Sequence, residues 1–327
     1  MSQAYGSDIV QGAIAFHQPQ IAEAESMLMS ISNPASDRFG QYLDGKAVEA
    51  FFAPAEDSQR KYLPGSKPAE LYGIPLGTKA APNNSLGIYG NGDAYNQANL
   101  DNFWSKYARF ISKGTGPKVN SINGAKAPGE ENGGEEMLDL QMAYPIVWPQ
   151  KVTVFQTPYN NGGGLLNDFL DAVDASYCHY DGGDDPEFDP KFPIFGGWQG
   201  PAMCGTYKVT NVVSISFALD ESSLSRHYVQ RQCHEWMKLA LRGVTVVVAA
   251  GDRGVQGNTG CIFDPKHPKK EIFNPLFPSS CPYVTTVGAT QVNFDGSRRR
   301  EVAVFDPKHN YYSGGETYIT SQSGSLL

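Results

Sequence analysis

The sequence lacks the run of about 18 apolar residues that a membrane-spanning helix needs. It also lacks a basic block, since 26 Lys and Arg stand against 34 Asp and Glu and give a formal charge of −8. Nucleic-acid backbones bind to basic surfaces, so neither a nucleic acid nor a membrane is expected as a partner. The opening MSQAYGSDIVQG has neither basic residues nor an apolar stretch, so no secretory signal is expected in it.

Two common catalytic motifs are missing as well. His234-Glu235 has no second histidine four positions later, which excludes the zinc-binding helix of a metalloprotease. No G-x-S-x-G turn is present to carry a nucleophilic serine. The six histidines form no other set, so no metal site is expected from them.

Material for a packed core is abundant, because 40% of the residues are hydrophobic and 17 Tyr and 17 Phe are among them.

The first part of the chain differs from the rest. Residues 21–31 carry apolar side chains at helical spacing, and GKAVEAFFAP predicts a second helix that stops at Pro54. The polar, turn-forming stretch that follows, EDSQRKYLPGSKP, is typical of a linker. A small helical unit joined to a larger domain is therefore expected.

From about residue 69 onward, apolar runs alternate with helical patterns. Strands are expected at 86–90, 151–156, 211–217, 244–251 and 283–292, and helices at 94–111, 165–176 and 223–243. This alternation predicts an α/β domain with a doubly wound, mostly parallel sheet. Such folds place their sites at the carboxyl ends of the strands.

Five cysteines are present, and four of them fall in two close pairs within loop-like sequence. Without CxxC spacing these pairs favour disulfides, Cys178 with Cys204 and Cys261 with Cys281, over a zinc site. Five reduced thiols are the alternative, and Cys233 is left over in a helical stretch. The acidic segment 181–190 is interpreted as a solvated loop, because its spacing does not match a calcium-binding EF-hand loop.

One candidate for chemistry is GGEEMLDLQ at 133–141. If a helix begins after the glycines, Glu135 and Asp139 lie one turn apart on one face. Two carboxylates this close repel each other, so one of them keeps its proton to higher pH when water is excluded. The alternative is a solvated helix start, where acidic residues favour the helix dipole.

Two further candidates for a site lie in glycine-rich turns that follow predicted strands. Asp252 follows the buried strand at 244–251 and is positioned either for a site or for backbone hydrogen bonding in the turn. Gly90-Asn91-Gly92-Asp93 imitates the start of a dinucleotide-binding loop, but Tyr95 stands where the third glycine belongs. A nucleotide-binding protein is therefore retained only as a third hypothesis.

Taken together, these segments resemble the sedolisin family of serine-carboxyl peptidases, in particular the secreted fungal tripeptidyl-peptidases. SNPASDRFGQYL and AVEAFFAP look like the front of that family's activation prosegment. The resemblance is carried in order by PAELYGIP (68–75), LGIYGNGDAYNQANLDNFW (86–104), GGEEMLDLQ (133–141), VTVVVAAGDRGVQG (244–257) and FNPLFPSSCPYVTTVGAT (273–290).

The resemblance implies a subtilisin-like fold with a Glu-Asp-Ser triad. In the E-x-x-x-D motif, Glu135 would be the general base, and Asp139 would orient it and share its proton. Glu136 lies outside that spacing. Asp252 matches the family's oxyanion-hole acid, whose carboxyl group can donate a hydrogen bond only when it is protonated, as under acid conditions.

The sequence departs from the family at the nucleophile. No S-G-T-S-x-S-x-P segment is present, and neither Ser323 nor Ser325 has the required spacing or a following proline, so no nucleophile is assigned. The family's calcium site also belongs to the absent C-terminal part, so no cofactor is expected. A prosegment remnant at 10–58, a linker at 59–67 and an incomplete peptidase domain at 68–327 are expected.

These departures leave two functional hypotheses besides the nucleotide-binding one. The first is an extracellular, monomeric acid peptidase, either a tripeptidyl-peptidase or an endopeptidase, acting on peptides or unfolded protein. The second is a non-catalytic peptide-binding remnant, or pseudoenzyme, that keeps the acids without the serine. This polypeptide alone is expected to be inactive, because loss of a triad member costs several orders of magnitude in rate.

Overall fold

A computed structural model describes residues 21–41, 72–74, 77–130, 133–159, 165–175, 196–264, 266–295 and 298–314. The chain divides into two compact units, Met1–Leu76 and Gly77–Leu327. In the first unit, helix α1 spans Ile21–Ser32, which confirms the expected helix there. The second expected helix and the linker at 59–67 lie outside the described residues.

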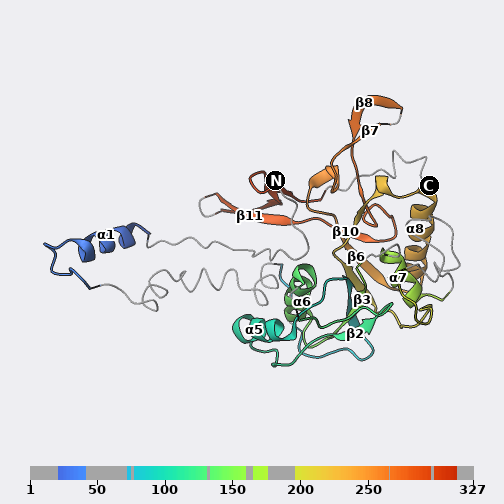
Figure 1. Ribbon diagram of the computed structural model, residues 1–327, viewed down its shortest axis with the longest axis horizontal. Coiled ribbons are helices and arrows are strands. Elements are labelled where there is room, and N and C mark those ends of the chain that lie inside the picture. Colours follow the sequence, from blue (N-terminus) through green and yellow to red (C-terminus); the bar gives the residue numbers. More distant parts are fainter. Residues whose placement is uncertain are drawn as a thin grey trace. The chain divides into compact units, whose positions relative to one another are not determined.

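The second unit alternates strands and helices, as predicted (Figure 1). Its helices are α5 (Gln97–Tyr107), α6 (Gly134–Val147), α7 (Leu165–Val173) and α8 (Arg226–Leu241). Its main sheet contains β1 (Ser85–Asn91), β2 (Lys118–Ser121), β3 (Lys151–Thr157), β4 (Val212–Ile215), β6 (Thr245–Ala249) and β10 (Thr285–Val287). The strand β2 was not anticipated from the sequence, because KVNS is short and polar.

The main sheet has six strands in the order β10-β6-β4-β1-β3-β2, and every neighbouring pair is parallel. Parallel neighbours need crossover connections, and the helices supply them. The strand β1 lies inside the sheet, and its pairing with β3 extends from Ser85 opposite Lys151 to Asn91 opposite Thr157. The predicted α/β class with a mostly parallel sheet is confirmed.

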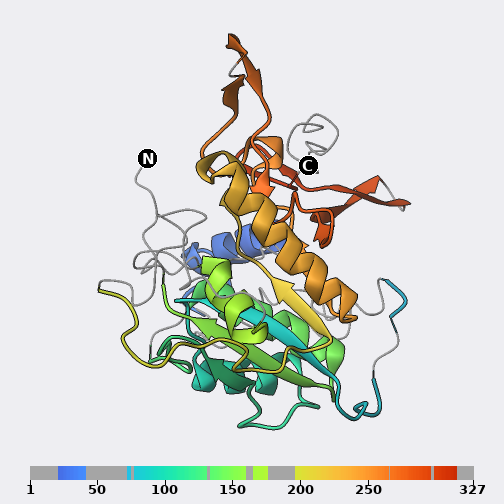
Figure 2. The same ribbon diagram turned by 90° about the vertical axis from the view of Figure 1, so that its right-hand side faces the viewer.

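Both faces of this sheet are covered. Side chains alternate along the strands, so Ile88 and Tyr89 enter two different buried clusters. One cluster joins the sheet to α5 and α6 and includes Leu100, Trp104, Leu140, Tyr144, Val152 and Val154. The other joins it to α7 and α8 and includes Phe155, Phe169, Val213, Ile215, Trp236 and Val248. The long helix α8 runs across its face of the sheet (Figure 2).

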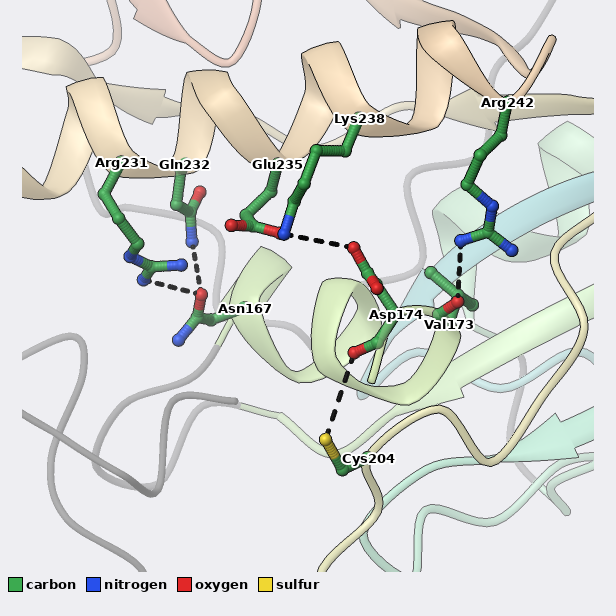
Figure 3. A network of polar contacts seen from close by, with 9 residues as sticks. All are labelled: Asn167, Val173, Asp174, Cys204, Arg231, Gln232, Glu235, Lys238 and Arg242. Atoms are coloured by element: carbon green, nitrogen blue, oxygen red, sulfur yellow. Dashed lines mark hydrogen bonds and ion pairs between the residues drawn. The ribbon is translucent and has the colours of Figure 1, made fainter. Parts of the chain in front are cut away.

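The helices α7 and α8 are also tied to each other by polar contacts (Figure 3). Lys238 forms an ion pair with Asp174 at 3.1 Å, and Arg231 donates to Asn167 at 2.8 Å. Arg242 reaches the carbonyl of Val173 at 3.2 Å. Buried polar groups are costly without partners, so this network fixes how the two helices pack.

The region after β6 departs from the expected pattern. The strand predicted at 283–292 is divided into β10, which joins the main sheet, and β11 (Thr290–Asp295), which pairs with β12 (Arg298–Ala303) in a hairpin. Gly288 lies between the two strands, which is where the single-strand prediction fails. Other short antiparallel pairs are β5 (Leu219–Asp220) with β9 (Leu276–Phe277), β7 (Ile262–Asp264) with β8 (His267–Ile272), and β13 (Phe305–Asp306) with β14 (Tyr311–Tyr312). The described residues also form 3-10 turns at Glu221–Ser223 and Gly254–Gln256.

The expected disulfide between Cys261 and Cys281 is wrong. Cys281 is bonded to Cys233, with their Cα atoms 5.7 Å apart, and Cys261 is free and exposed. The cause is burial: Cys233 is on the inward face of α8 and Cys281 lies in the same core, whereas Cys261 precedes the exposed strand β7. Cys204 is in a disulfide, while Cys178 lies outside the described residues.

No helix within the described ranges has the length and apolar character needed to cross a bilayer.

Candidate active site

Three neighbouring strands of the main sheet end at the same edge. In the order β6-β4-β1, they are followed at their carboxyl ends by Asp252, Ser216 and Asp93. The carboxyl edge of a parallel sheet is where this class of fold places its ligands. The helix α6 contributes Glu135 and Asp139 to the same location, since both interact with residues from these strand ends.

The start of α6 is fixed by Asp93. Its carboxylate accepts the backbone N–H groups of Glu135 at 2.8 Å and Glu136 at 3.0 Å. Such bonds satisfy the unpaired donors of a helix N-terminus. Gly133 has no side chain to offer as a cap, and a Cβ atom there would overlap the Asp93 carboxylate. The glycine and the aspartate together therefore set where the helix begins.

Glu135 and Asp139 lie one helical turn apart on α6, as predicted. Burial raises the pKa of Glu135 to about 7, and the charges of Asp139, Asp252 and Asp93 add to that rise. Exclusion of water is therefore the main reason that Glu135 keeps its proton to higher pH, and the neighbouring acids add to it. A carboxyl group with such a pKa can both accept and return a proton near neutral pH.

Asp139 is held by a residue from a different element. The hydroxyl of Ser216 donates to Asp139 Oδ1 at 2.8 Å. Burial raises the pKa of Asp139 to about 6, whereas the Ser216 hydrogen bond opposes this rise. Both acids of the pair therefore hold their protons to higher pH than carboxyl groups in water do.

Glu136 is a third acid on α6 and is buried in the protein. It is 1% exposed, and its Oε1 accepts the backbone N–H of Tyr95 at 3.2 Å. Burial raises the pKa of Glu136 to about 8. A Cβ atom on Gly90 would come within 2.5 Å of Glu136 Oε2 and 3.0 Å of Gln156 Oε1, so the absence of a side chain at Gly90 makes room for this third acid.

Asp252 lies on the exposed turn after β6. Gly251 adopts φ +94°, and a Cβ atom there would collide with Leu276, so the turn requires glycine. The backbone carbonyl of Asp252 accepts the N–H of Tyr312 at 2.8 Å. The Asp252 charge is one of those that raise the pKa of Glu135, which brings all three sequence-predicted acids into one electrostatic group.

The glycine-rich segment at 90–93 has a structural role in this arrangement. Gly90 accommodates Glu136, and Asp93 caps α6 instead of opening the helix that follows it in sequence. That next helix, α5, is capped by Asn96, whose side chain accepts the N–H of Asn99 at 3.1 Å. These contacts do not favour the dinucleotide-loop interpretation.

Sequence reasoning missed Ser216 and the capping role of Asp93. Asp93 follows the strand predicted at 86–90, so the rule that sites gather at carboxyl strand ends could have found it. Ser216 lies inside the strand predicted at 211–217 and follows a strand end only because β4 stops at Ile215. Across the described ranges, no group of three or more His, Cys, Asp or Glu side chains could hold a metal ion.

Comparisons with known proteins agree on one family. The model described as Pro-kumamolisin, activation domain, matches residues 2–63, a range that includes residues 10–58, where a prosegment remnant is expected. Aorsin from Aspergillus oryzae is 45% identical over 267 residues, which cover 75% of this chain and 40% of that protein. Tripeptidyl-peptidase sed1 from Aspergillus fumigatus is 44% identical over 252 residues, covering 72% of this chain and 38% of that protein. The chain thus spans about two fifths of the length of these relatives.

A solved structure is also similar: Pseudomonas sedolisin (serine-carboxyl proteinase), complexed with two molecules of pseudo-iodotyrostatin. The likeness has a TM-score of 0.44 at 17% sequence identity and covers 71% of this chain and 56% of that one.

Proposed function

Because the chain belongs to the sedolisin family, we propose that the whole protein is a serine-type peptidase that cleaves peptides or unfolded protein at acid pH. The observation that carries the proposal is the convergence of Glu135, Asp139 and Asp252 at the carboxyl edge of the parallel sheet. Peptide hydrolysis by acyl transfer needs a nucleophile, a base with an orienting partner, and a group that stabilises the oxyanion.

Glu135 is the proposed general base. It takes the proton of the nucleophile's hydroxyl group and later returns it to the leaving amine. Asp139, one turn further along α6, orients Glu135 and shares that proton. The pKa values of about 7 for Glu135 and about 6 for Asp139 leave most of the pair protonated at acid pH, so the fraction that has lost one proton provides the base. The remaining proton passes between the two acids at little cost because their pKa values are similar.

Asp252 is the proposed oxyanion acid. Its charge is one of those that raise the pKa of Glu135, which supports a location close to that residue. A protonated carboxyl group at this point donates a hydrogen bond to the oxygen of the tetrahedral intermediate. This requirement links the mechanism to acid conditions. No residue of this chain is assigned as the nucleophile, and Ser323 and Ser325 lie outside the described residues.

The disulfides support an extracellular location. Cys233 is bonded to Cys281, and Cys204 is also in a disulfide. Disulfides persist in oxidising compartments and are rare in the cytosol. All three acids of the proposed site come from this one chain, which is consistent with action as a monomer.

The experiment is incubation of the full-length gene product with an unfolded protein substrate at acid pH, followed by mass spectrometry of the products. Release of successive tripeptides indicates a tripeptidyl-peptidase, and internal fragments indicate an endopeptidase. A serine-directed peptide aldehyde is added in parallel. Binding of a plain peptide without cleavage or aldehyde labelling would contradict the proposal and favour the non-catalytic peptide-binding alternative.

A further inference from the structure

Ser216 occupies a distinctive place in the sheet. It immediately follows β4, which lies between β1 and β6, the strands that lead to Asp93 and Asp252. Its side chain is part-buried, and its hydroxyl donates to Asp139 Oδ1 at 2.8 Å. The contact joins residues 77 positions apart and links the sheet to α6.

The Asp139 carboxyl depends on this contact. Its other oxygen, Oδ2, is buried and has no hydrogen-bond partner among the described residues. Hydrogen bonds to a carboxylate are stronger than neutral ones, and a buried carboxylate without a donor is costly. The Ser216 hydroxyl is therefore the donor that holds Asp139 in one orientation.

The same hydroxyl also lies within hydrogen-bonding reach of Glu135, whose pKa it lowers. A serine hydroxyl has a single proton, and the geometry gives that proton to Asp139. The one hydroxyl proton can therefore serve only one of the two acids at a time.

We propose that Ser216 is a positioning residue for the Glu135–Asp139 pair, holding Asp139 as a hydrogen-bond acceptor so that the pair can share one proton. The inference rests on the proposed function of these two acids. Ser216 acts only through the acids and is not assigned a contact with substrate. No bond is made or broken at Ser216 in this role.

The charges around the pair decide the expected pH effect. From α6 they include Glu136, from the segment after β1 Asp93, and from the turn after β6 Asp252. All are acids and oppose ionisation of the pair, whereas the Ser216 hydrogen bond favours it. Removing the hydroxyl should therefore keep Asp139 protonated to higher pH.

The test compares Ser216→Ala and Ser216→Thr with the wild type in the full-length gene product. In Ser216→Ala we expect kcat at acid pH to fall about tenfold, with KM nearly unchanged and the acid limb of the pH profile moved to higher pH. Ser216→Thr keeps the hydroxyl and should restore most of kcat. An unchanged pH profile in a folded Ser216→Ala variant would overturn the inference.

Ser223→Ala is the matched control. The Ser223 hydroxyl donates at 2.7 Å to the backbone carbonyl of Asp220. The variant therefore loses a similar hydrogen bond without affecting Glu135 or Asp139. Thermal melting at acid pH checks that each variant is folded. Failure of Ser216→Thr to restore activity in a folded protein would also count against the inference.

An activity-independent measurement separates this inference from the proposed function. The carboxyl carbon of Asp139 is followed by carbon-13 NMR in aspartate-labelled protein, with Asp139→Asn identifying the signal. Its titration should move to higher pH in Ser216→Ala and stay in place in Ser223→Ala. If the wild type cleaves nothing but the titration moves, the proposed function fails and the positioning role holds. If the titration does not move, the positioning role fails.

Discussion

The carboxylate of Asp93 accepts the backbone N–H of Glu135 at 2.8 Å, joining two residues 42 positions apart in the sequence. Through this contact, the turn after β1 sets where α6 begins and hence where its first acidic residue stands. The glycine-rich turn thus positions the proposed base, rather than binding a nucleotide.

Replacing Asp93 by alanine should therefore do more than weaken a helix. Loss of a side-chain cap costs about 1–2 kcal/mol of unfolding free energy. We also expect Asp93→Ala to lower kcat, because the frayed helix start no longer fixes Glu135. Urea denaturation and steady-state kinetics measure the two effects.

Ser225→Ala supplies the matched control for that prediction. Ser225 caps α8 through the N–H of Tyr228 at 3.3 Å and touches none of the proposed site acids in the described contacts. Ser225→Ala should lower the unfolding free energy by a similar amount without changing kcat. Equal losses of kcat in Ser225→Ala and Asp93→Ala would contradict the prediction, because the loss would then follow from lower stability and not from the position of Glu135.

The buried acids of α6 predict a loss of stability as pH rises. Burial raises the pKa values of Glu135 to about 7, Glu136 to about 8 and Asp139 to about 6. In the unfolded chain these groups ionise near pH 4, so between that pH and about 8 the unfolded state releases protons that the folded state keeps. Their contribution is complete below the unfolded pKa values and is lost as pH passes through the folded ones. Thermal melting across this range should show the highest melting temperature at its acid end.

Glu136→Gln should flatten the upper part of that pH dependence. A glutamine has the same shape but never ionises, so the variant avoids burying a charge at pH values near 8. The exposed Glu130 provides the control, and Glu130→Gln should follow the wild-type curve. A wild-type melting temperature that rises from acid to neutral pH would contradict this account of the acids.

Gly90 should be intolerant of a side chain, and the reason is Glu136. In Gly90→Ala the new methyl group would lie 2.5 Å from Glu136 Oε2. Overpacking of this kind costs about 1–3 kcal/mol. In a Glu136→Ala background the same substitution should cost clearly less, and a double-mutant cycle by urea denaturation measures the difference. Additive effects would mean that the two residues do not compete for this space.

The disulfide between Cys233 and Cys281 should be important for stability. It closes a loop with a sequence separation of 48 residues, for which chain entropy predicts about 3–4 kcal/mol. Cys233→Ser should lose about that amount, whereas Cys261→Ser should change little, because Cys261 is free and exposed. Peptide mapping under non-reducing conditions checks the pairing, and a Cys261–Cys281 linkage would refute it.

The sequence was a good guide to the regular elements. The strands at 151–156 and 244–251 and the helix at 223–243 have strong apolar patterns and appear as β3, β6 and α8. Helix spacing predicts that Glu135 and Asp139 lie one turn apart, but their assignment as a catalytic pair came from the family resemblance. The hydrophobic pattern did not reveal the break at Gly288, where the predicted single strand is divided into two strands that belong to different sheets.

The remaining features depend on tertiary contacts that local sequence does not encode. Cys281 forms its disulfide with Cys233 because both are buried in one core, although Cys261 is nearer to Cys281 in sequence. Asp93 and Ser216 reach α6 only because β1 and β4 are neighbours in the sheet. Spacing along the chain could not reveal either relationship.

The central claim is that Glu135 is the base of an acid peptidase, and kcat/KM of Glu135→Gln in the full-length gene product tests it most directly. The amide keeps the size of the side chain but cannot take a proton. The account predicts a fall of about 100-fold to 10,000-fold at acid pH, with Glu130→Gln unchanged. A Glu135→Gln variant that cleaves peptides as fast as the wild type would contradict it.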